Sequence, residues 1–192
     1  KIILSRAALC CTIALQAENV WTGSHAVSWD NTITSAADKF ANAQVGDLMT
    51  LSFTATEADV IELKSDGKRL AGTRFHQFYP DQTKMETYIT ADMLNVLKAT
   101  GLEICGKKFT ATSVDFDIVG YNMPDGAIWA GWFWCDDWKT LELWKEAFDK
   151  YNGQRYLVVN FSEESYDYEY EFNIISSWEK GAFSNASNTS YE

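Results

Sequence analysis

The sequence has few of the residues on which metal centres, nucleophilic catalysis and nucleic-acid binding depend. Of its 192 residues only two are histidine and two are proline, and acidic residues outnumber basic ones 27 to 16, which gives a net charge of −11. A surplus of negative charge opposes binding to nucleic acid and to anionic membrane surfaces, so we expect neither partner. The sequence also has no glycine-rich phosphate loop, Gly-x-Ser-x-Gly elbow or Cys-x-x-Cys pair. We therefore expect no cofactor, while a structural calcium ion stays open.

Long hydrophobic runs are missing as well. The apolar stretch at 7–13 is far shorter than the about 20 residues that span a bilayer, so we expect no membrane insertion. It follows a short basic segment and precedes a small residue, which is the pattern of a signal peptide over 1–17. This predicts a secreted or cell-surface protein, periplasmic or extracellular. Two alternatives to a signal peptide stay open: Cys10 or Cys11 could carry a lipid, or the segment could be a core strand or helix at the start of the chain.

Aromatic residues are in excess, with eight Trp, nine Tyr and eleven Phe. Several of them recur in segments separated by a nearly constant offset. The matching segments are 20–23 with 128–131, 37–40 with 147–150, and 49–53 with 157–161. We interpret this as a tandem repeat with one full module at 18–121 and a second, C-terminally incomplete module at 127–192. Further domains of a longer chain fit this interpretation; the alternative is that aromatic-rich strands look alike.

Many short strand signals and few helical ones run through the first module. Strands are predicted at 32–34, 48–53, 59–63, 74–78, 86–89 and 111–118, and hairpin turns at 45–47 and 65–68. Helical spacing predicts a helix at 91–99 that Gly101 closes, a turn of helix at 36–41, and a helix at 140–151 in the second module. This pattern indicates a mostly β protein with a β-sandwich fold. Cys105 and Cys135 fall in different modules, so we expect free buried thiols.

Several motifs together resemble a known type of protein. They are Trp-x-Gly at 21–23, a second Trp at 29, Ala-Asp-Lys-Phe at 37–40, Val-Gly-Asp at 45–47, and Gly-Leu-Glu-Ile-Cys-Gly at 101–106 before a β-branched strand. They resemble the secreted jelly-roll modules of polysaccharide-degrading and cell-surface proteins of gut and rumen bacteria, which are similar to carbohydrate-binding modules. The resemblance covers the first module and about two-thirds of the second. It implies a jelly-roll-like β-sandwich that holds an enzyme or surface assembly near a polysaccharide.

The densest aromatic stretch, 129–138, offers candidate sugar-binding residues. Trp132 and Trp134 fall on one face of a strand and have no counterpart in the first module, while Asp136 and Asp137 follow directly. An indole stacks on the C–H face of a sugar ring and carboxylates accept its hydroxyl protons, so we predict that these four residues bind ligand. The alternative places both rings in the core. Because the repeat aligns them in pairs, four other tryptophans are expected in the core: Trp21, Trp29, Trp129 and Trp138.

The strand at 74–78 is a second candidate. Alternation puts Arg74, His76 and Phe78 on one face and Gln77 on the other, an arrangement of an aromatic among hydrogen-bonding groups that suits a glycan groove. It also suits an ordinary sandwich strand, and that alternative fits somewhat better.

Three carboxylates alternate with tyrosines near the end of the chain. Asp167, Glu169 and Glu171 would lie on one strand face, about 6–7 Å apart by the strand rise. This lies between the carboxylate separations of retaining and inverting glycosidases, but a solvated acidic face fits better. We therefore predict a non-catalytic protein that binds a polysaccharide or oligosaccharide weakly. The alternatives are a structural or protein-interaction module and a small glycoside hydrolase.

Overall fold

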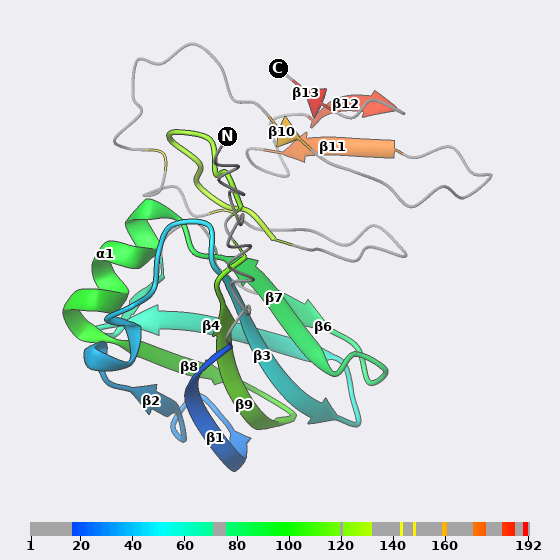
Figure 1. Ribbon diagram of the computed structural model, residues 1–192. Helices are drawn as coiled ribbons and strands as arrows, with labels where there is room; N and C mark the ends of the chain where they lie inside the picture. The colour runs from blue at the N-terminus through cyan, green and yellow to red at the C-terminus, as the bar shows by residue number, and fades with distance from the viewer. Residues whose placement is uncertain are drawn as a thin grey trace, which may run out of the picture. The chain divides into compact units, whose positions relative to one another are not determined.

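Figure 1 shows the protein as a computed structural model, which divides into two compact units, residues 1–150 and 151–192. The structure describes residues 17–70, 76–119, 121–131, 143, 148, 159–160, 171–175, 182–186 and 190–191. The predicted signal peptide, apart from Ala17, lies outside the described residues, as does all of the predicted helix at 140–151 except Leu143 and Phe148.

The first unit consists of two antiparallel sheets. Its elements are β1 (Glu18–Val27), β2 (Ile33–Ser35), the 3-10 helix η1 (Ala37–Phe40), β3 (Leu48–Ala55), β4 (Asp59–Ser65), β5 (Lys68–Arg69), β6 (His76–Phe78), β7 (Lys84–Tyr88), α1 (Ala91–Thr100), β8 (Leu102–Gly106) and β9 (Phe109–Asp117). Sheet A has the strand order β1-β9-β3-β7. Sheet B has the order β2-β8-β4, and both β5 and β6 pair with the remaining edge of β4.

The connections between the sheets follow a single rule. Each strand of sheet A is joined along the chain to the strand in the equivalent position of sheet B: β1 to β2, β9 to β8, β3 to β4, and β7 to β6 (Figure 1). Two antiparallel layers whose strands are connected in this way form a jelly roll. The prediction of a jelly-roll-like β-sandwich is therefore confirmed for the first module.

The core lies between the two sheets. Along β3 and β9 buried side chains alternate with partly exposed ones, as expected for strands with one face against a core. Three rings contact one another with centroids 5.1 to 5.7 Å apart and edge-to-face geometry: Phe53 on β3, Phe78 on β6 and Phe109 on β9. Burial of each ring contributes about 2 kcal/mol, so this trio holds sheet A against sheet B.

Helix α1 begins and ends where the sequence predicts. The Thr90 side chain accepts a hydrogen bond from the Met93 N–H at 3.3 Å and so caps the helix N-terminus. Met93 and Leu97 face the core. Gly101 ends the helix with φ +83, and a Cβ added there would lie 2.1 Å from the Ser35 carbonyl oxygen, so only glycine fits this close approach.

The β4–β5 connection is a two-residue hairpin. Ser65 pairs with Lys68, and the two residues between them, Asp66 and Gly67, both have positive φ, +52 and +67. This is the geometry of a type I′ turn, for which Asp-Gly is a favoured sequence. The predicted turn at 65–68 is confirmed. The turn at 45–47 is not a hairpin, because it leads from η1 into β3.

The other strand predictions also agree with the structure, with end shifts of a few residues. Residues 74–75 of the predicted strand at 74–78 lie outside the described residues, and β6 covers the rest. The sequence patterns do not predict β1 or β5 as strands. In the second unit, β10 (Val159–Asn160) pairs with β13 (Ser190–Tyr191), and β11 (Glu171–Ile175) pairs with β12 (Ala182–Ala186). A second, partial jelly roll stays a prediction.

The beginning of the predicted second module is bonded to the first unit. The Tyr88 N–H donates to the Ala130 carbonyl at 2.8 Å, and Thr87 forms an antiparallel bridge with Gly131. Residues 130–131 therefore extend sheet A beyond β7. The boundary proposed between 121 and 127 stays a prediction.

Two glycine substitutions test the close approach at the end of α1. We expect Gly101→Ala to lower the free energy of unfolding by at least about 3 kcal/mol, because backbone strain adds to overpacking against Ser35. Gly67→Ala is the matched control: its φ is also positive, but the added Cβ meets nothing within 4 Å. It should cost about 1 kcal/mol. Urea unfolding measures both, and equal losses would contradict the steric argument.

Candidate functional site

The outward surface of sheet B carries the best candidate site, and we call it the polar face. The residues that alternate with core positions on its strands are Thr34, Val60, Glu62, Lys64, Arg69, Gln77, Glu103 and Cys105. Four of these form one row across four strands, since Thr34 pairs with Glu103, Glu103 with Lys64, and Lys64 with Arg69. Side chains paired in this way lie close enough to bind one small ligand together.

A buried carboxylate anchors the centre of this face. Glu62 is only 4% exposed and pairs with both the Arg69 guanidinium and the Lys64 ammonium, the latter at 3.4 Å. A buried charge is tolerated only when it is paired and hydrogen-bonded. The two cations of the row are therefore engaged by Glu62.

Cys105 lies under this cluster. Its Sγ is 3.7 Å from Glu62 Oε2, and the residue is fully buried and free. Burial raises the pKa of its thiol to about 11, against the opposing influence of Lys64, so the thiol is unreactive at neutral pH. The prediction of a free buried thiol is confirmed for Cys105; Cys135 lies outside the described residues.

Trp29 places an aromatic ring on the polar face. The Lys64 ammonium lies 5.8 Å from its ring centroid, a cation–π contact. Trp29 belongs to the β1–β2 loop, and β8 separates β2 from β4, so the indole extends across the outer surface of the sheet. It is half-buried and not part of the core. The expectation of a core role is therefore wrong for Trp29, while Trp21 packs against the core as expected.

The structure separates the residues predicted on β6. Gln77 is exposed on the polar face, opposite Val60. His76 and Phe78 point the other way and are 6% and 3% exposed, because Phe78 belongs to the aromatic trio that joins the sheets. These two side chains are closed to a ligand from solvent, which corrects their assignment to a glycan groove and favours the ordinary-strand alternative.

The other predicted site residues lie outside the described part of the chain. They are Arg74, Trp132, Trp134, Asp136, Asp137, Asp167 and Glu169. Glu171 is described as the first residue of β11. No sequence signal marked Trp29 as a surface residue, because a loop residue has no strand periodicity from which its direction follows.

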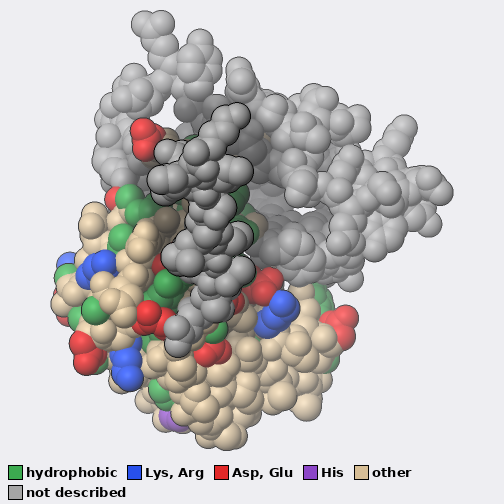
Figure 2. All heavy atoms as spheres, viewed as in Figure 1, with side chains coloured by type: hydrophobic (Ala, Val, Ile, Leu, Met, Phe, Trp, Pro, Cys, Tyr) green, Lys and Arg blue, Asp and Glu red, His purple; other side chains and the backbone are tan. Residues whose placement is uncertain are grey.

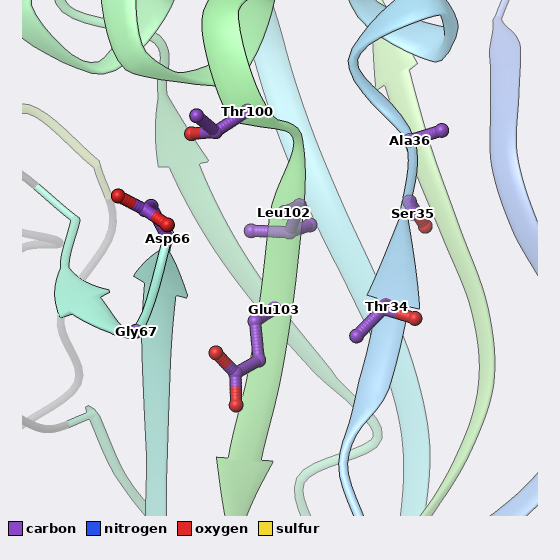
Figure 3. Close-up of a pocket in the computed structure, with 8 residues that line it drawn as sticks. All are labelled: Thr34, Ser35, Ala36, Asp66, Gly67, Thr100, Leu102 and Glu103. Carbon is purple, nitrogen blue, oxygen red and sulfur yellow. The ribbon is translucent and has the colours of Figure 1, made fainter.

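A pocket of about 350 Å³ opens beside the row. Its lining residues are Thr34, Ser35, Ala36, Asp66, Gly67, Thr100, Leu102 and Glu103. In Figure 3 the side chains of Leu102 and Glu103 on β8 point toward the β4–β5 turn, which carries Asp66. Thr34 and Glu103 belong both to the pocket and to the row, so the pocket continues the polar face.

On the face shown in Figure 2 the described residues form no continuous basic area. Figure 2 shows Asp and Glu side chains scattered over the described residues with a few Lys and Arg among them. Within the described ranges no three His, Cys, Asp or Glu side chains are grouped to hold a metal ion. In that same part of the chain no helix combines the length and apolar character that crossing a membrane requires.

Comparisons with known proteins find similarity among solved structures. Neither a protein-family model nor a curated protein matches the sequence. Among solved structures the chain is similar to the Bacteroides ovatus mixed-linkage glucan utilization locus SGBP-B in complex with a mixed-linkage heptasaccharide, at a TM-score of 0.45 and 23% identity. The match covers 52% of this chain and 30% of that one, so the chain spans less than a third of that protein's length. A likeness at this TM-score carries no argument about function.

The buried histidine of β6 predicts a pH effect on stability. Burial lowers the pKa of His76 to about 4, and within the described residues its Nε2 has no hydrogen-bond partner. The unfolded chain binds a proton below about pH 6.5 and the folded protein only near pH 4. Stability should therefore fall by about 3 kcal/mol as the pH drops through this window.

His76→Leu isolates this contribution, because the carboxylates that titrate in the same range are common to both proteins. Urea unfolding at pH 7 and pH 4.5 should show a smaller loss for the variant than for the wild type, by about 2–3 kcal/mol. Parallel losses would show that His76 accepts a proton while folded.

Proposed function

We propose that this protein binds a glycan without catalysis, and that the polar face of sheet B is a binding surface. The observation that carries the proposal is the half-buried Trp29 ring, held over the sheet by Lys64 and bordered by a row of hydrogen-bonding side chains. A sugar has apolar C–H faces and polar edges, so it needs a flat aromatic surface next to acceptors and donors.

The polar face supplies those groups. Glu103 is an acceptor for sugar hydroxyls, while Thr34 and Gln77 can each donate and accept. Hydrogen bonds of this kind contribute about 1 kcal/mol each. Few contacts on an open sheet face therefore predict weak binding, in the micromolar to millimolar range.

The sequence-based candidates remain part of the proposal. Trp132 and Trp134, with Asp136 and Asp137, would form a second aromatic surface, and Arg74 would reach the ligand from the segment before β6. The signal-peptide pattern supports a secreted or cell-surface location. A role in holding an enzyme or assembly near a polysaccharide follows from the family resemblance.

A protein-interaction role is the second candidate. Three exposed apolar side chains of the first unit lie near one another: Val45 (42% exposed), Val119 (39%) and Tyr121 (45%). They do so because Val45 precedes Gly46, whose backbone approaches the Tyr121 carbonyl. Tyr121 also stacks on Tyr88 with ring centroids 4.5 Å apart. Adjacent exposed apolar side chains are typical of a contact surface between proteins.

Substitution of Trp29 tests the first proposal. We expect Trp29→Ala to weaken binding to neutral polysaccharides by about tenfold or more, the loss of roughly 1.4 kcal/mol of stacking. Trp29→Phe should retain most of the affinity, because it keeps an aromatic face. Affinity electrophoresis against a panel of soluble glucans, xylans and mannans measures both variants.

Trp132→Ala and Trp134→Ala distinguish the two aromatic surfaces. If binding is lost only in these variants, the ligand lies on the second surface and not on the polar face. Absence of binding by the wild type across the panel would favour the protein-interaction role.

A further inference from the structure

The pocket beside the polar face has the size for a single small unit. Its volume of about 350 Å³ lies near the lower limit of ligand sites in proteins. Its walls come from β2, the start of β8, the end of α1 and the β4–β5 turn. It lies alongside the polar row, so a chain that crosses the row could place one terminal or branching unit in it.

The lining of the pocket is acidic and hydroxylated. Asp66 and Glu103 contribute carboxylates, and Thr34 and Thr100 contribute hydroxyls. Among the eight described lining residues none is Lys, Arg or His. Thr100 is the last residue of α1, and the C-terminal end of a helix carries partial negative charge. The pocket therefore accepts hydrogen bonds from uncharged hydroxyls and repels anions.

The neighbouring cations do not reverse this preference. Lys64 and Arg69 share the row with Glu103, but both pair with the buried Glu62. Drawing either cation toward a ligand would leave the buried Glu62 carboxylate with only one of its two charged partners, which is unfavourable. An acidic sugar would have to compete with Glu62 for them.

We propose that this pocket is a subsite for one uncharged sugar unit and that it excludes uronate and sulfated units. The proposal rests on the glycan-binding function assigned to the polar face. Trp29 stacks on a unit next to the pocket, because Lys64 contacts the Trp29 ring and is the cross-strand partner of the pocket residue Glu103. The same Glu103 carboxylate then accepts hydroxyl protons from the bound unit.

The test compares neutral and acidic probes of one length. Calorimetric titrations use cellohexaose, xylohexaose and mannohexaose against hexagalacturonate. We expect at least one neutral hexasaccharide to bind the wild type at least tenfold more tightly than hexagalacturonate. Glu103→Gln and Asp66→Asn should each weaken the neutral probe about fivefold, since a charged acceptor makes a stronger hydrogen bond than an amide oxygen.

Asp66→Asn keeps the turn, because Asn-Gly is also a favoured type I′ sequence. Glu103→Lys reverses one charge in the pocket and should raise affinity for hexagalacturonate at least tenfold.

The matched control is Asp81→Asn. Asp81 is an exposed carboxylate in the β6–β7 turn, at the opposite end of β4 from Asp66. The affinities of this variant should equal those of the wild type.

The outcomes separate the two proposals. If a neutral hexasaccharide binds but the pocket variants behave like Asp81→Asn, the pocket is not a subsite and the glycan-binding function stands. If the wild type binds hexagalacturonate as tightly as the neutral probes, the charge selectivity is overturned. If Trp29→Ala leaves neutral binding intact, the polar face is not the binding surface, and the pocket proposal falls with it.

Discussion

The contact of Phe53, Phe78 and Phe109 across the two sheets is the constraint that orients the rest of this module. Its three rings come from β3, β6 and β9, and their centroids lie less than 6 Å apart. Side chains alternate along a strand, so fixing Phe78 inward also turns His76 inward and Gln77 outward. The hydrophobic core thereby decides which polar groups of sheet B meet on its outer surface. The candidate site depends on this core through geometry and not through direct contact.

Local signals were sufficient for much of the fold. The Asp66-Gly67 dipeptide favours one turn geometry, and the structure has it. The apolar spacing of Met93 and Leu97, with Gly101 after it, predicts a helix at 91–99, and the structure has it at Ala91–Thr100. The strand pairing could not be derived in this way, because neighbours such as β1 and β9 are far apart in sequence. The jelly-roll topology came from the family resemblance, and the connection of each strand to its counterpart in the other sheet confirms it.

The candidate site was harder to predict, because alternation shows which residues share a face but not which face is buried. Over the segment 74–79 both faces carry hydrogen-bonding and aromatic residues, so the sequence offers no basis for placing His76 inside and Gln77 outside. Trp29 lies in a loop, where no period applies, and its alignment with another tryptophan suggested a core position. The cation–π contact with Lys64 shows that its ring lies over the sheet. Glu62 carried no signal either, since its burial depends on Arg69 from the next strand.

The β4–β5 turn has a consequence for how such a module can diversify. Asp66 and Gly67 hold the hairpin in register and also form one wall of the pocket. Both have a backbone conformation that few residue types tolerate, so mutation can explore little at these two positions without loss of folding. Thr34 and Glu103 lie on the walls formed by β2 and β8. Their backbone has an ordinary strand conformation, which many residue types tolerate. A lineage that acquires a new ligand would be expected to change the walls formed by β2 and β8 while it retains the turn.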